Sequence, residues 1–119
     1  MPPGDFNLRP LDRLLKRDLS AIVFVRDYLQ FQFDGPVLTA YIWPVVYVTI
    51  DGCTAEQPGY RDNLCSFIGR KVLRVGGKKG EYIDIEFTGD RRLRFSLSEA
   101  DRVGPEAIMF NDNEVWEVW

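Results

Sequence analysis

Few side chains in this sequence are of the types that perform covalent or acid–base chemistry. The chain has no histidine, which excludes a Ser-His-Asp triad, a Cys-His pair and a histidine-based metal site. The two cysteines, Cys53 and Cys65, do not make a zinc-binding pattern. Cys65 lies in an apolar segment without an adjacent base, so we interpret it as a core thiol rather than a nucleophile.

The acidic and glycine-rich segments also lack the context that catalysis needs. Asp84 and Glu86 could serve as an acid–base pair, but on a strand they point to one side, beside arginines, as ionised surface groups do. Residues 76–80 lead into a strand, so no helix N-terminus awaits a phosphate. Residues 111–114 lack the glycine and length of a calcium loop. We therefore expect no enzyme activity, cofactor or metal, and a carboxylate site in a sheet cleft is only an alternative.

Charge is unevenly distributed along the chain. The net charge is −3, so the chain lacks a global basic footprint for nucleic acid. Residues 69–94 are nevertheless locally basic, which indicates either a surface for a polyanion or an ion-paired, solvated hairpin. The pattern favours the hairpin. The candidate basic patch consists of Arg70, Arg74, Lys78, Lys79, Arg92 and Arg94.

The elements that would position these residues occur twice. Residues 28–35 align with residues 82–89, 54 positions later, and each copy predicts a short helical turn followed by a three-stranded antiparallel meander. The first copy covers about residues 14–50, with strands at 21–25, 28–33 and 37–43. The second covers about 64–97, with strands at 70–75, 82–87 and 92–97. We predict a mainly β fold in which the two meanders pack as a sandwich or a partly open barrel.

Apolar alternation predicts the strand registers. It places Phe87 opposite Leu93 in the second copy and Phe33 opposite Leu38 in the first. The hairpin loop is then residues 35–36 in the first copy and residues 89–91 in the second copy, so the loop of the second copy is one residue longer. Glu86 would face Arg94 on the outer side.

The outer faces of the two copies differ in composition. Alternation gives the second copy a charged outer face, whereas Tyr28, Gln30, Tyr41 and Trp43 give the first an aromatic, uncharged one. Such a face is usually covered. The cover could be the chain itself, through its tail or residues 45–50, or it could be a partner or an identical subunit.

The remaining segments complete a single domain spanning residues 1–119. Residues 45–50 are strand-like, and residues 51–63 form an internal linker. In the extension 98–119, Ser98 can cap a helical turn. Residues 108–110 and 115–119 then predict a closing hairpin. We expect this tail, which ends in tryptophan, to dock in the sheet; the alternative is a tail that captures a partner.

The second half carries a resemblance. The segments concerned are residues 64–72, the strands at 85–87 and 93–97, Pro105-Glu106-Ala107 and the terminal tryptophan. They approximate a pattern of LIGxxV, PEA and W, with Phe67 at the position of the leucine. This pattern resembles small uncharacterised bacterial proteins of unknown function. The resemblance implies a bacterial, cytoplasmic setting and transfers no site residue. We also expect no secretion signal, and no stretch reaches the roughly 20 apolar residues of a membrane span.

These observations favour a non-enzymatic protein-interaction module that binds a protein partner or self-associates as a homodimer. An immunity-like inhibitor of a toxin is a more specific version, suggested by the small size and acidity. Polyanion binding through the basic second copy is the alternative from another class. No membrane, metal or nucleic-acid partner is expected.

Overall fold

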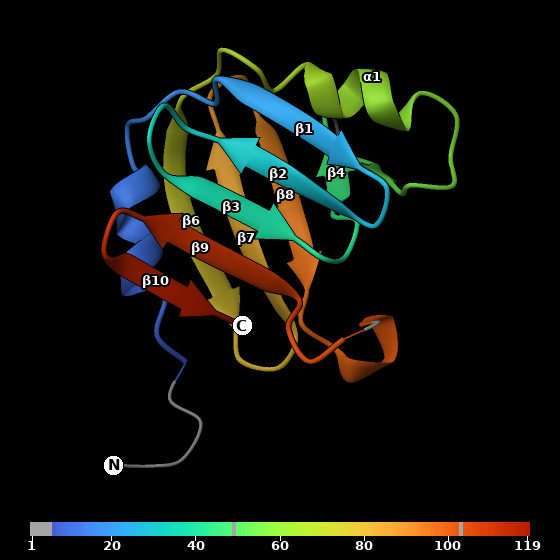
Figure 1. Ribbon diagram of the computed structural model, residues 1–119. Helices are drawn as coiled ribbons and strands as arrows, with labels where there is room; N and C mark the ends of the chain where they lie inside the picture. Colours follow the sequence, from blue (N-terminus) through green and yellow to red (C-terminus); the bar gives the residue numbers. More distant parts are fainter. Residues whose placement is uncertain (1–5, 49, 103) are drawn as a thin grey trace.

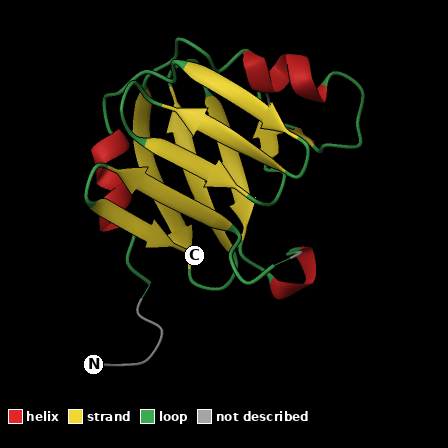
Figure 2. Ribbon diagram, in the orientation of Figure 1, coloured by secondary structure: helices red, strands yellow, loops and turns green. Residues whose placement is uncertain are grey.

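The protein is a sandwich of two five-stranded antiparallel sheets (Figures 1 and 2), which confirms the predicted fold class and excludes a closed barrel. The computed structural model describes residues 6–48, 50–102 and 104–119. The first sheet has the order β1-β2-β3-β9-β10 and the second β5-β4-β8-β7-β6. The strands are β1 Ala21–Val25, β2 Tyr28–Gln32, β3 Val37–Ala40, β4 Val45–Tyr47, β5 Gly52–Cys53, β6 Val72–Lys78, β7 Tyr82–Phe87, β8 Arg91–Ser96, β9 Ile108–Asp112 and β10 Val115–Val118.

The described residues also form three short helices. The 3-10 helix η1 (Arg9–Leu14) precedes β1, the α-helix α1 (Tyr60–Cys65) precedes β6, and the 3-10 helix η2 (Glu99–Asp101) follows β8. The side chain of Ser98 caps η2 by accepting a hydrogen bond from the Ala100 N–H, as the sequence predicts. Helix α1 begins within the predicted linker and extends past its end at residue 63, and its buried side chains are Tyr60 and Leu64.

Each half of the chain contributes strands to both sheets. The meander β1-β2-β3 lies in the first sheet, and the chain then crosses to add β4-β5 to the second. The meander β6-β7-β8 lies in the second sheet, and the chain then crosses to add β9-β10 to the first. The predicted closing hairpin is thus the counterpart of β4-β5, and the repeated unit is larger than the meander alone.

The strand registers of the two halves correspond position by position. Val46 pairs with Cys53 and with Leu93, and Phe110, 64 positions after Val46, pairs with Glu117 and with Leu38. The bridge between Asp18 and Lys71 lies where the halves meet. There, Leu19 N–H donates to Arg70 O, and Val72 N–H donates to Arg17 O. This reciprocal bonding is what a two-fold relation between the halves requires.

The predicted registers within the hairpins are wrong by two residues. Phe87 pairs with Arg91 rather than Leu93, and Phe33 N–H donates to Pro36 O rather than facing Leu38. A shift by two leaves every side chain on its predicted face, so alternation alone could not detect it. The loop is residues 34–35 in the first copy and residues 88–90 in the second copy. The loop of the second copy is thus one residue longer, as predicted.

Aromatic side chains from both halves meet in the core. Phe33 and Phe87 are buried and stack, with ring centroids 6.4 Å apart. Phe31 and Phe95 contact edge-on at 5.7 Å, as do Phe67 and Phe87 at 5.1 Å. The first two contacts join the two sheets, and the third packs the segment after α1 against β7.

Three further predictions need correction. The glycines at 76 and 77 continue β6 instead of forming a loop. The strand predicted at 45–50 ends at Tyr47, and Thr49 of that segment lies outside the described residues. Cys65 is exposed at the end of α1 rather than a core thiol, because α1 buries its other side.

Candidate interaction surface

The outer face of the first sheet carries no Asp, Glu, Lys or Arg among its described residues. Cross-strand pairing places Val23, Gln30, Thr39, Met109 and Val118 in one row across all five strands. We call this surface the uncharged face. It consists of Ala21, Val23, Val25, Tyr28, Gln30, Gln32, Val37, Thr39, Tyr41, Met109, Asn111, Trp116 and Val118.

No described segment lies over the uncharged face (Figure 1). The C-terminal segment extends the sheet edge-on as β9-β10, and β4 belongs to the other sheet, so neither predicted self-cover occurs. Trp116 is 60% exposed and Val23 36%. They stand on the two edge strands of the sheet, β10 and β1, and the positions between them are uncharged.

The structure brings three of the four predicted face residues together and separates the fourth. Gln30 lies on β2 beside Tyr28, whose ring centroid is 6.0 Å from that of Tyr41. Trp43 follows a bend after β3 and instead packs against Tyr60 of α1, with ring centroids 6.0 Å apart. The prediction for Trp43 was wrong because it assumed that strand alternation continues past Ala40, where β3 ends.

Sequence reasoning missed the contribution of the C-terminal hairpin to this face. Trp116 and Val118 share one side of β10, and Met109 shares that side on β9. Their alternation was visible in the sequence. Nothing local, however, indicated that β9 pairs with β3, because that pairing joins strands about 70 positions apart.

The equivalent face of the second sheet is built from ion pairs. The Arg94 guanidinium donates two hydrogen bonds of 2.8 Å to the Asp84 carboxylate, and this bonding raises the pKa of Arg94 above its usual range. Arg92 lies 3.8 Å from the same carboxylate. The two guanidiniums also stack over tyrosine rings, Arg92 over Tyr47 and Arg94 over Tyr82. We call this surface the charged face.

The predicted basic patch is therefore largely neutralised by its own neighbours. Arg74 pairs with Glu86 at 3.0 Å, and Lys78 with Glu81 at 3.1 Å. Arg70 donates to the backbone oxygens of Ser66 and Thr88 instead of projecting into solvent, and Lys79 is exposed. The arrangement is that of the ion-paired hairpin.

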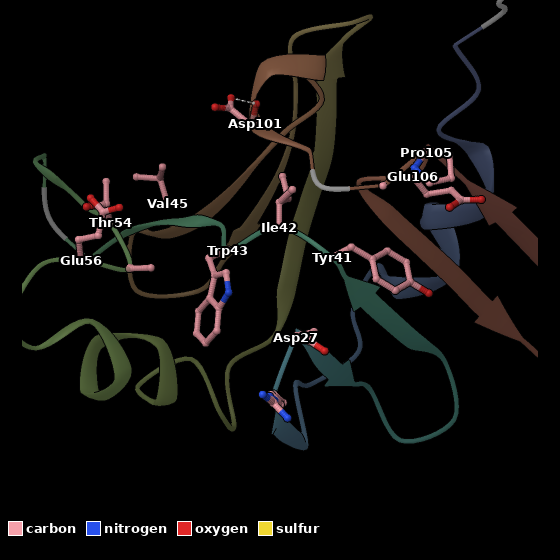
Figure 3. A pocket seen from close by; sticks show the side chains of 14 residues that line it. Asp27, Tyr41, Ile42, Trp43, Val45, Thr54, Glu56, Asp101, Pro105 and Glu106 are labelled. Atoms are coloured by element: carbon pink, nitrogen blue, oxygen red, sulfur yellow. Dashed lines mark hydrogen bonds between the residues drawn. The ribbon is translucent and has the colours of Figure 1, made fainter.

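A groove of about 960 Å³ opens beside the uncharged face (Figure 3). The β1-β2 turn, the crossing from β3 to β4 and two loops line it, and Tyr41 and Trp43 point in different directions at its wall. Its charged lining residues are Arg26, Asp27, Glu56, Asp101 and Glu106. Asp101 is held by a hydrogen bond from the Ser96 Oγ at 2.5 Å.

The described residues offer no metal centre and no membrane-spanning element. Across residues 6–48, 50–102 and 104–119, no three or more His, Cys, Asp or Glu side chains are grouped to hold a metal ion. Within those same ranges no helix has the length and apolarity to cross a bilayer. Cys53 and Cys65 are free thiols.

Comparison with known proteins adds no relative: no family model, no curated protein and no solved structure matches this chain.

Proposed function

We propose that this chain is a non-enzymatic protein-interaction module whose working surface is the uncharged face. The observation that carries the proposal is the absence of Asp, Glu, Lys and Arg from the described outer positions of five adjacent strands. A protein partner would remove Trp116, Val23 and Met109 from water, which is favourable at about 25 cal/mol per Å² of apolar area. It would meet no charge that needs a counterion.

The composition of the surface supports a protein partner rather than a small molecule. The uncharged face is a broad sheet surface, and its tryptophan, tyrosine and methionine side chains are the types enriched at protein interfaces. Charged residues stand at its margin, such as Arg26 and Asp27 in the β1-β2 turn and Asp34 in the β2-β3 turn. Depletion of charge at the centre, with charged residues at the rim, is the usual organisation of such an interface.

Polyanion binding is less well supported. A polyanion would need free basic side chains on the charged face. Arg74 already binds Glu86, and both Arg92 and Arg94 bind Asp84. A phosphate would have to displace those carboxylates. The proposal also includes a cytosolic setting, which the free thiols support.

Site-specific photo-crosslinking tests the proposal. The photo-reactive residue p-benzoylphenylalanine is placed at Gln32 on the uncharged face and, as the matched control, at the equivalent position Glu86 on the charged face. After irradiation in an extract of the source cells, we expect discrete protein adducts from position 32 and none from position 86. Equal yields from the two positions, or no adduct from position 32, would contradict the proposal.

Trp43 is unsuitable for this test. Its ring packs against Phe24 and Tyr60, so a charged substitution there would destabilise the fold and confuse unfolding with lost binding. Gln32 is partly exposed on the face, and its replacement leaves the core intact.

A further inference from the structure

Strand β1 forms an edge of the first sheet with backbone groups that no other strand uses. Ser20 N–H donates to Gln32 O at 2.8 Å, and Phe33 N–H donates to Pro36 O at 2.9 Å. The backbone of Gln32 therefore points toward β1, and that of Phe33 toward β3. Since bonding alternates along an antiparallel pair, the N–H and C=O groups of Ile22 and Phe24 point away from the sheet.

Nothing described binds those outward groups. Within residues 6–48, 50–102 and 104–119, no hydrogen bond reaches residues 21–25 from outside β2. The strand reads Ala-Ile-Val-Phe-Val, without charge, proline or glycine. An edge of this kind is a template for another strand.

The other three edges are protected. Strand β6 has a register irregularity between Val72 and Arg74 and carries Arg74 and Lys78. Strand β5 is two residues long. Strand β10 carries Glu117, and η1 packs against it. Short length, charges, bulges and a covering helix are devices that prevent edge-to-edge pairing. Strand β1 has none of the first three, and α1 contacts it through the Arg61 guanidinium, 5.0 Å from the Phe24 ring centroid, without a hydrogen bond to its outward backbone groups.

We propose that β1 pairs antiparallel with β1 of a second copy of this chain, with Val23 at the two-fold axis. This register places Ile22 opposite Phe24 of the second copy, so the outward groups of both residues are satisfied in both copies. Val23 lies opposite Val23 of the second copy in the non-hydrogen-bonded position, where side chains are closest. The two first sheets become one continuous sheet of ten strands.

The occupant is a second copy because the strand is complementary to itself. In an isologous contact every residue must tolerate its own equivalents, and an apolar strand with no charge meets no like charge across the axis. The pairing also joins the two uncharged faces into one larger surface. The inference rests on the proposed function in assigning the chain a protein partner, and it adds a contact with a second copy at the edge of the uncharged face.

Charge reversal at the axis tests the register. Val23→Lys and Val23→Asp each place like charges directly opposite one another, so each variant should run as a monomer in light scattering, whereas the wild type should have twice the 13.8 kDa chain mass. An equimolar mixture of the two variants should regain the dimer mass. Gln32→Lys, on the same face but away from the edge, is the control and should remain dimeric.

Disulfide trapping locates the contact. In a Cys53→Ser/Cys65→Ser background, Val23→Cys should form an intermolecular disulfide under mild oxidation, because the paired Cα atoms lie within disulfide range. Ala21→Cys should not, since Ala21 lies opposite Val25 of the second copy, far from Ala21 of that copy. Efficient cross-linking at position 21 would overturn the register.

A monomeric wild type at micromolar concentration would overturn the inference. That result would leave the proposed function testable, because adducts from Gln32 to other proteins do not require the dimer. Conversely, a dimer of wild type with no adduct from position 32 would retain the β1 contact and remove the docking role of the face.

Discussion

The two outer faces of this molecule occupy equivalent positions in the same architecture and differ in almost every side chain. Gln30 and Thr39 pair across β2 and β3, and Asp84 and Arg94 pair across β7 and β8 in the corresponding place. One level along the strands, Gln32 pairs with Val37, where the second sheet has Glu86 and Arg92. The fold accepts charge at these positions, so it does not require the uncharged composition of the first sheet.

The buried faces show the opposite relation. Leu11 and Leu14 of the first half correspond to Leu64 and Phe67 of the second, and all four are fully buried. The halves therefore share an apolar core, even where the side chains differ in size, as at Val46 and Phe110, whereas their outer faces differ in charge. This contrast supports our proposal that the charged face stabilises the fold and the uncharged face binds a partner.

The largest expected effect tests whether the two halves contribute equally to the core. Phe33→Ala and Phe87→Ala each remove one ring of the stacked pair where the sheets meet. Each should lower the free energy of unfolding by about 3–5 kcal/mol, as measured by urea denaturation. A loss confined to one variant would show that the core is not shared in the way the registers imply.

The next effect separates the roles of the two faces. Asp84→Asn removes the carboxylate charge that binds both Arg92 and Arg94, and it should cost about 1–2 kcal/mol of stability. Gln30→Ala, at the equivalent position on the uncharged face, should change stability by less than about 0.5 kcal/mol. Chemical denaturation of both variants checks the contrast, and equal losses would remove it.

A smaller effect compares the turns that precede β1 and β6. Gly69 has a φ of +89° and Lys16, its counterpart, a φ of +68°. Nothing lies within 4 Å of a Cβ built at Gly69, so Gly69→Ala adds only backbone strain, about 1 kcal/mol. Lys16→Gly should stabilise by less than that amount, because glycine also gains freedom in the unfolded chain. Thermal unfolding shows whether each variant is more or less stable than the wild type. A stabilising Gly69→Ala would refute the explanation by backbone strain.

The smallest effect appears only at alkaline pH. Burial, with a further contribution from Cys53, raises the pKa of Tyr60 above its usual value of 10.0, and its hydroxyl donates to Pro44 O at 2.5 Å. The unfolded chain therefore loses this proton at a lower pH than the folded chain does. The stability that the protonated hydroxyl contributes is fully present below pH 10 and falls as the pH rises above it. Tyr60→Phe should show a shallower alkaline loss in denaturation from pH 9 to pH 11. An identical slope in both proteins would exclude Tyr60 as the cause.

Alternation predicted the strands and their faces well because burial acts on every second residue. Residues 82–87 form β7 as predicted, and Ile83, Ile85 and Phe87 are all buried. The one-residue difference between the hairpin loops was also readable. Turn chemistry did not fix the register, because the left-handed residues Asp34 and Asp90 allow tighter loops than the apolar pairing suggested.

The sequence pattern did not predict which strands belong to which sheet. The exchange of β4-β5 and β9-β10 between sheets depends on pairings between distant strands, which no local signal encodes. Trp43 was misplaced for a related reason, since the chain leaves β3 at Ala40 and bends before it reaches the tryptophan. The sequence predicted ion pairs across the charged face. Because the register is shifted by two residues, Arg94 pairs with Asp84 instead of Glu86.

The most direct test transfers the charged pair from one face to the other. Gln30→Asp combined with Thr39→Arg reproduces the Asp84–Arg94 pair at its equivalent position, and p-benzoylphenylalanine at Gln32 reports on docking. Because Thr39 is buried, the arginine should lower the free energy of unfolding by about 1–3 kcal/mol. In the folded variant, photo-adducts from position 32 should fall to the level seen from position 86. Undiminished adducts from the folded variant would contradict the claim that the uncharged face is the working surface.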